Sequence, residues 1–203
     1  MRYSLSYTAA SLRIHDTLWV AEAMHKDNFE GLDGKIGNGK SATGRRIRME
    51  LMKRLENLTA SQFNYLLDAN LDNARRMAFV AICKTYAFIY EFVVEALREK
   101  MHQRDYVVSD GEYLSFFNRK AELHPELEDL SETSAYKIKQ VLFKILEEVG
   151  LIDSVRNKVL QPQFLSTQLE KLIREDDPQL LRIFFTTNAD INNNPYDKPI
   201  NIH

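Results

Sequence analysis

Between Met77 and Leu97 the chain reads MAFVAICKTYAFIYEFVVEAL, a segment in which apolar residues occupy nearly every side of a helix. A helix of this kind has no face suited to water and is buried in the centre of a protein. The segment therefore predicts a central core helix, or a pair of helices, which Asp72 would cap at the start. Cys83 lies inside the segment, and we expect this thiol to be packed rather than reactive.

The composition predicts a mostly α protein with one well-filled core or two small ones. Of the 203 residues, 44% are hydrophobic and only 7 are glycine, and leucine far outnumbers valine. The single cysteine excludes an intramolecular disulfide and a zinc site built from cysteines. The longest uncharged runs, Asn57 to Leu67 and Val159 to Leu169, contain 11 residues and are too short to cross a bilayer. With no signal pattern at the N-terminus, we expect a cytoplasmic protein that does not enter membranes.

A glycine-rich segment precedes a basic helix in the first half of the chain. Residues Gly34 to Ser41 match the phosphate-loop pattern of nucleotide-binding proteins, in which backbone N–H groups surround the phosphates. Such a loop follows a buried strand, and the residues before Gly34 show no strand pattern. We therefore favour a flexible loop that supplies Ser41 or Thr43 as a helix cap. The helix that follows has apolar residues at helical spacing and arginines on its other faces.

The second half of the chain predicts a winged-helix-like unit. Ser109 and Glu112 form a capping box for one helix. A short helix follows around Pro125, and a third, longer helix ends at Gly150. Two short β-prone runs around a polar turn occupy residues 151–162 and predict a small β-hairpin. Three helices followed by a hairpin is the order of a winged helix-turn-helix.

The expected organisation is a helical, basic N-terminal half over residues 1–104 and a winged-helix-like half over residues 105–185, packed together as one compact unit. Residues 186–203 are rich in Asn, Pro and Asp and predict a loosely ordered tail. The two halves differ in charge. Up to residue 104 the chain has 16 lysines and arginines and 12 acids, and after it 11 and 17.

The distribution of charge indicates two candidate nucleic-acid-binding surfaces. Between residues 35 and 54 the only acid is Glu50, which favours phosphate contact over a merely solvated helix face. The basic residues of this stretch are Lys35, Lys40, Arg45, Arg46, Arg48, Lys53 and Arg54. The second surface comprises Lys137 and Lys144 on the third helix of the second half, and Arg156 and Lys158 in the expected wing. Acids just before that helix would repel DNA, so the second surface ranks below the first.

The sequence shows no recognisable catalytic constellation. It lacks a Gly-x-Ser-x-Gly elbow and a His-Glu-x-x-His zinc helix, and its histidines are isolated. We therefore expect no enzyme activity, no metal site and no cofactor.

Several segments, in this order along the chain, resemble the BrxA family. They are Ser41 to Ile47 with Arg54-Leu55, Ala81 to Phe92, Phe116-Phe117 with Lys120, His124 to Leu127, and Lys137 to Leu146 leading to Gly150-Leu151-Ile152. The resemblance covers about Tyr3 to Phe185, and the spacing of the segments makes it specific. It implies a mostly helical bacterial protein, related in shape to the antitermination factor NusB, that serves BREX bacteriophage exclusion. It also implies double-stranded DNA binding without known catalysis.

The leading hypothesis is therefore a NusB-like helical protein that acts as a non-enzymatic, double-stranded DNA-binding accessory protein of a BREX phage-defence system. The basic helix, and the wing with it, would contact phosphates. The alternative is an assembly adaptor whose helical surface docks other BREX proteins and whose basic stretch contacts a protein partner. A nucleotide hydrolase comes third. The contact residues are chosen by charge and not by the resemblance, which supplies no catalytic residue.

Overall fold

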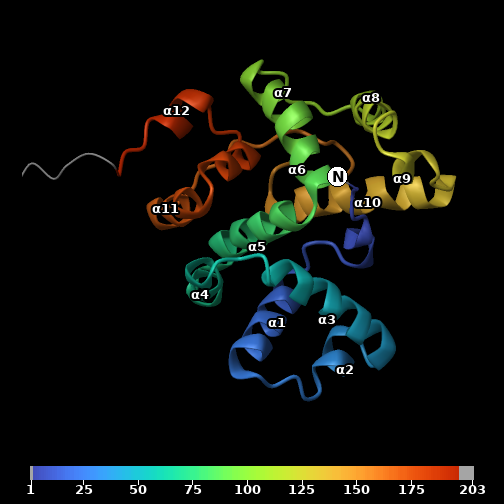
Figure 1. Cartoon of the computed structure of the whole chain (residues 1–203), viewed down its shortest axis with the longest axis vertical. Helices are drawn as coiled ribbons and strands as arrows, with labels where there is room; N and C mark the ends of the chain where they lie inside the picture. Colours follow the sequence, from blue (N-terminus) through green and yellow to red (C-terminus); the bar gives the residue numbers. More distant parts are fainter. Residues whose placement is uncertain (1, 197–203) are drawn as a thin grey trace, which may run out of the picture.

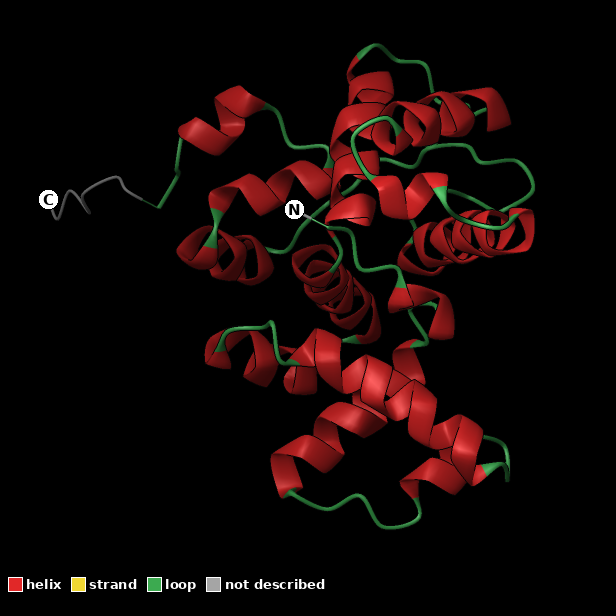
Figure 2. Ribbon diagram, turned by 45° about the vertical axis from the view of Figure 1, so that its right-hand side comes forward, coloured by secondary structure: helices red, strands yellow, loops and turns green. Residues whose placement is uncertain are grey.

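The computed structural model describes residues 2–196, and over this range the chain consists of helices joined by loops, with no strand (Figures 1 and 2). The α-helices are α1 (Ile14–Lys26), α2 (Leu32–Ile36), α3 (Ser41–Leu55), α4 (Ala60–Asp68), α5 (Leu71–Thr85), α6 (Ala87–Phe92), α7 (Arg98–His102), α8 (Asp110–Ala121), α9 (Pro125–Glu128), α10 (Glu132–Val149), α11 (Thr167–Asp176) and α12 (Asn188–Asn192). The described residues also form two 3₁₀ helices, η1 (Ser6–Ala9) and η3 (Pro178–Phe184), and one π-helical turn, η2 (Val93–Leu97). The prediction of a mostly α protein is confirmed.

Helix α5 forms the centre of the fold, as the apolar segment predicts. Every side chain from Met77 to Cys83 is buried, because α1, α3, α4 and α10 all pack against α5. Asn70, and not the expected Asp72, caps the helix. The side chain of Asn70 accepts a hydrogen bond from the backbone N–H of Asn73 at 3.0 Å.

The apolar segment forms a pair of helices because it breaks at Tyr86, whose backbone is extended. The chain bends there by 110° between Leu71–Thr85 and Ala87–His102. These two segments reach the length and hydropathy of a membrane span only when they are taken together. No single helix within residues 2–196 does so.

Two glycines allow α2 and α3 to pack closely. A Cβ atom on Gly44 would lie 1.7 Å from the carbonyl oxygen of Asp33, and one on Gly37 would lie 2.2 Å from that of Lys40. Side chains therefore do not fit at either position. The segment expected as a flexible loop is partly helical, since Gly34 lies within α2. This arrangement is not the open loop after a strand that a phosphate-binding pattern requires.

The hairpin expected over residues 151–162 does not form as strands. Its remnants are isolated antiparallel bridges between Ile152 and Leu160 and between Val107 and Val159. The chain between them turns like a helix, because the N–H of Lys158 donates to the carbonyl of Ser154 at 2.9 Å. Lys158 also has a left-handed φ of 54°, which interrupts strand pairing. The helices expected of a winged helix are present as α8, α9 and α10, but a loop stands where the wing was expected.

The expected ends of the longer helices in this half are confirmed. The Ser109 hydroxyl accepts from the N–H of Glu112 at 3.2 Å, and the Glu112 carboxylate accepts from the N–H of Ser109 at 2.6 Å. Helix α10 ends at Gly150, whose φ of 81° suits glycine. These short-range contacts follow directly from neighbouring residues in the sequence.

Part of the segment expected as a loose tail is a docked helix. In α12 the side chain of Ile191 is buried. Arg174 of α11 donates to the carbonyl oxygens of Asp190 at 3.0 Å and of Ile191 at 2.9 Å. The polar composition gave no sign of this docking because its anchor is an arginine on another helix. The remainder of the expected tail, residues 197–203, lies outside the described residues.

Candidate nucleic-acid interface

Helix α3 begins without a cap at an exposed end. Lys40 occupies the N-cap position, and no side chain there accepts from the free N–H groups of the first turn. The helix dipole makes this end partly positive, and Lys40, Arg45 and Arg46 are exposed around it. Within residues 2–196, only Arg48 and Arg54 of the basic stretch form ion pairs. We call Lys40, Arg45, Arg46 and the exposed Met49 the α3 face.

Three other predicted contact residues are partly engaged by the protein itself. Arg48 forms a two-point ion pair with Asp33 at 2.6 and 3.2 Å, which lowers the pKa of the Asp33 carboxyl. The Nζ of Lys35 lies 3.5 Å from the centre of the Trp19 ring. The Nζ of Lys53 donates to two serine hydroxyls near the N-terminus, at 3.0 and 3.1 Å. Lys35 and Lys53 remain exposed, whereas Arg48 holds α2 against α3.

The prediction that Arg54 contacts phosphate is wrong. Its side chain is only 3% exposed and pairs with the buried carboxylate of Glu50 at 2.9 Å. It also donates to the carbonyl oxygens of Ala10 at 2.6 Å and Ser11 at 2.7 Å. Arg54 therefore fastens the N-terminal segment to α3, and its burial keeps it from any external ligand.

A groove of about 360 Å³ beside α10 brings the two predicted lysines of this helix together with Arg13. Lys137 and Lys144 lie about two turns apart on α10, with Gln140 between them. The opposite wall is the segment from Thr8 to Ser11. No carboxylate from the described part of the chain lines this groove. We call the cations Arg13, Lys137 and Lys144 the α10 groove cations.

Arg13 is the groove residue that sequence reasoning missed. It has a left-handed φ of 45° directly before α1. Its guanidinium pairs with Asp16 and donates to the carbonyl oxygen of Ile36 at 3.3 Å, so it links α1 to α2. No signal in the sequence distinguishes Arg13, because the groove exists only once the start of α1 packs beside α10.

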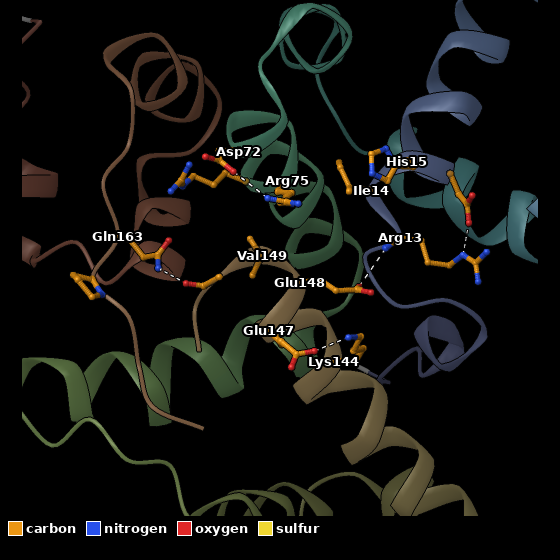
Figure 3. Close-up of a pocket in the computed structure, with 14 residues that line it drawn as sticks. Arg13, Ile14, His15, Asp72, Arg75, Lys144, Glu147, Glu148, Val149 and Gln163 are labelled. Atoms are coloured by element: carbon orange, nitrogen blue, oxygen red, sulfur yellow. Dashed lines mark hydrogen bonds and ion pairs between the residues drawn. The ribbon is translucent and has the colours of Figure 1, made fainter. Parts of the chain in front are cut away.

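A larger cleft of about 680 Å³ adjoins the groove and shares Arg13 and Lys144 with it (Figure 3). Acids balance the cations here. Lys144 pairs with Glu147 at 2.5 Å and lowers the pKa of that carboxyl. Arg75 pairs with Asp72 at 3.0 Å along the wall that α5 forms in Figure 3. Because the cleft has mixed charge, the smaller groove is the better place for a phosphate.

The two cations of the expected wing have different surroundings. Lys158 is half-buried, and its Nζ pairs with Asp110 at 2.9 Å. Lys139 pairs with the same carboxylate at 3.0 Å, and the two lysines together lower its pKa. Arg156 is exposed, and its neighbour Val155 lines the groove beside α10. Arg156 can therefore extend that groove, while Lys158 ties the loop to α8.

The fold is shared with a solved structure of low sequence identity. The crystal structure of an uncharacterized protein from Magnetospirillum magneticum matches with a TM-score of 0.77 and 16% identity. The match covers 92% of this chain and 99% of that one.

Two curated proteins are similar in sequence. The BREX protein BrxA of Escherichia coli O9:H4 (strain HS) is 24% identical over 132 residues, which cover 65% of this chain and 62% of that protein. The BREX protein BrxA of Bacillus cereus (strain H3081.97) is 22% identical over 129 residues, which cover 63% of this chain and 64% of that protein. The alignments thus span less than two thirds of each relative. The model of the BrxA family matches residues 1–177, most of the chain, and this chain therefore belongs to the BrxA family.

Proposed function

We propose that this chain is a non-enzymatic accessory protein of a BREX phage-defence system and that it binds double-stranded DNA. The names of the two curated relatives support the defence system. DNA binding rests on one observation, the uncapped start of α3 with its exposed cations Lys40, Arg45 and Arg46, which form no ion pair with the described residues. Free N–H groups at a helix start and nearby arginines are common ligands of phosphate.

The α10 groove cations supply a second set of phosphate contacts. The chain has a net charge of −2, so a duplex is attracted to local basic surfaces and not to the molecule as a whole. Contacts of this kind position a protein on DNA without reading the bases. The proposal keeps the NusB-like helical arrangement that the resemblance implies, with α8, α9 and α10 followed by a loop in place of a wing.

The proposal assigns no catalysis and no cofactor. Cys83, the single cysteine, is a buried residue of α5, and burial raises the pKa of its thiol. A thiol that stays protonated and out of reach of solvent is a poor nucleophile.

A titration of labelled duplex DNA by fluorescence anisotropy tests DNA binding. In the variant Arg45→Ala/Arg46→Ala, we expect weaker binding to unrelated duplexes by about the same factor, because phosphate contacts carry no sequence preference. The slope of log affinity against log salt should flatten by up to about 1.8, since each lost contact contributes about 0.9. The control Lys26→Ala/Lys171→Ala removes two exposed cations of α1 and α11 that pair with glutamates on their own helices. Equal affinities and slopes in both variants would contradict the proposal.

The alternative function is an assembly adaptor for other BREX proteins. Membership of the BrxA family supports a protein that works beside other BREX proteins. The exposed Met49 also gives the α3 face an apolar side chain that a protein partner could cover. An adaptor predicts that the Arg45→Ala/Arg46→Ala variant keeps its DNA affinity and salt slope but no longer co-purifies with other proteins of the defence system. That combination of results would replace the DNA-binding proposal.

A further inference from the structure

An apolar groove of about 390 Å³ lies between α8 and α10. Leu114 and Tyr136 stand on its two walls and are 55% and 67% exposed. Tyr113 and Phe117 extend the apolar lining, and Phe117 is half-buried. Exposed large apolar side chains are common singly, but several that line one groove mark a docking surface.

The surroundings of this groove are acidic. Between residues 105 and 136 the chain has eight acids and two basic residues. The two basic residues, Arg119 and Lys120, both pair with Glu95. Lys139, which lines the groove itself, pairs with Asp110 at 3.0 Å. Glu128 and Glu132, at the turn between α9 and α10, are exposed and form no ion pair with the described residues. A segment that fills the groove should therefore combine an apolar residue with flanking basic ones.

The α3 face has this combination. Met49 is 54% exposed, with Arg45 and Arg46 one turn before it and Lys53 one turn after it. An amphipathic helix that places one apolar stripe in a groove is a recurring mode of recognition. In Figure 1, α3 lies in the lower part of the molecule and α8 in the upper part, along its longest axis. One molecule cannot join these two surfaces to each other, but two molecules can.

We propose that a second copy of this chain docks its α3 face into the groove between α8 and α10, in a head-to-tail contact. Met49 of one copy packs between Leu114 and Tyr136 of the next, and its flanking arginines face the acidic rim. Because two different surfaces meet, the contact is heterologous and can repeat along a row of molecules. This interaction is distinct from DNA binding and competes with it, because both use Arg45 and Arg46.

Sedimentation velocity of the full chain tests the contact. An interface centred on one methionine is weak, so loading concentrations should run from about 5 µM to about 500 µM at low salt. We expect the sedimentation coefficient of the unmodified chain to rise with concentration and less so at high salt. Leu114→Asp should weaken association at least about tenfold, because it removes a buried apolar side chain from the contact. The control Leu123→Asp adds the same charge at a side chain that is 77% exposed and lies outside the groove, and it should associate like the unmodified chain.

A mixing experiment tests the head-to-tail arrangement. Met49→Asp and Leu114→Asp should each be monomeric alone, because each variant lacks one of the two surfaces. Mixed in equal amounts, they should form a one-to-one dimer through the remaining intact pair of surfaces. A monomeric unmodified chain at every concentration, or a mixture that stays monomeric, overturns the proposal. The DNA titration of Leu114→Asp should match that of the unmodified chain, so a failure of self-association is distinguishable from a failure of DNA binding.

Discussion

At the scale of single residues, a buried polar cluster joins the N-terminal segment, α3 and the bend after α5. Arg54 and Glu50 form its ion pair, and the Tyr86 hydroxyl donates to the same Glu50 carboxylate. Burial, together with this hydrogen bond, raises the pKa of Tyr86 to about 12. The cluster satisfies three polar side chains that would otherwise be costly to bury.

Arg54→Met should lower the free energy of unfolding by about 3 to 5 kcal/mol, because it leaves the Glu50 carboxylate buried without its partner. Urea denaturation measures this loss. The exposed control Arg46→Met should change stability by less than about 0.5 kcal/mol. Similar effects of the two substitutions would show that Arg54 is not enclosed.

Gly44→Ala should destabilise the protein by about 3 kcal/mol or more, because the added methyl group meets the backbone of Asp33 at 1.7 Å. Gly34→Ala is the matched control within the same glycine-rich segment. A Cβ atom there meets nothing within 4 Å, and alanine favours the helix by about 1 kcal/mol. Thermal melts of both variants should therefore shift in opposite directions. A stable Gly44→Ala variant would show that α2 and α3 do not pack this closely.

At the scale of secondary-structure elements, α10 is held by the apolar stripe that its sequence predicts. Ile138, Leu142 and Ile145 are all buried. Leu142→Ala should cost about 2 to 5 kcal/mol through lost apolar burial and the cavity that remains. Leu114→Ala on α8, where the side chain is more than half exposed, should cost much less. If the two variants unfold at the same urea concentration, Leu142 does not lie on the buried face of α10.

The loop after α10 depends on one carboxylate. Asp153 accepts from the N–H groups of Val159 at 2.8 Å and Ser154 at 2.6 Å, and these bonds help to lower its pKa below the ordinary value of 3.8. A lowered pKa means that Asp153 stabilises the fold above pH 3.8 and that this stabilisation is lost as the pH falls through the lower, folded value.

Asp153→Asn should therefore be less stable than the unmodified chain at about pH 6, and the difference should narrow below about pH 4, where the original carboxyl becomes protonated. Urea denaturation of both chains across this range measures the difference. The substitution Asp68→Asn, at the end of α4, is the control and should show no such narrowing, because its carboxylate accepts no hydrogen bond from the described residues. A constant difference for Asp153→Asn would contradict the role of its charge.

At the scale of the whole molecule, the α3 face and the α10 groove cations either contact one duplex together or act separately. Lys137→Ala/Lys144→Ala combined with Arg45→Ala/Arg46→Ala removes four cations. If one duplex touches both surfaces, the losses in salt slope should add, to as much as about 3.6. If only one surface binds, one of the two double variants should behave like the unmodified chain. Anisotropy titrations at several salt concentrations separate these outcomes.

The helical architecture could be predicted from the chain because it depends on neighbouring residues, whereas the family was predicted from the resemblance of several segments. The apolar segment at 77–97, the capping box at Ser109 and the helix end at Gly150 all arise from short-range spacing and hydrogen bonds. The hairpin at 151–162 was predicted from the same kind of signal and did not form. Strand pairing is long-range, so a β-prone sequence alone cannot determine it.

Which cations are available to a ligand was decided only by the tertiary structure. Arg54 and Arg45 belong to one basic stretch, yet packing buries the first against Glu50 and leaves the second exposed. Arg13 has no distinguishing neighbours in sequence and enters a groove with Lys137 through the packing of distant helices. Charge is a property of the residue and can be counted in the sequence. Its solvation and its partners depend on which segments fold around it, and those determine whether a cation is left to bind phosphate.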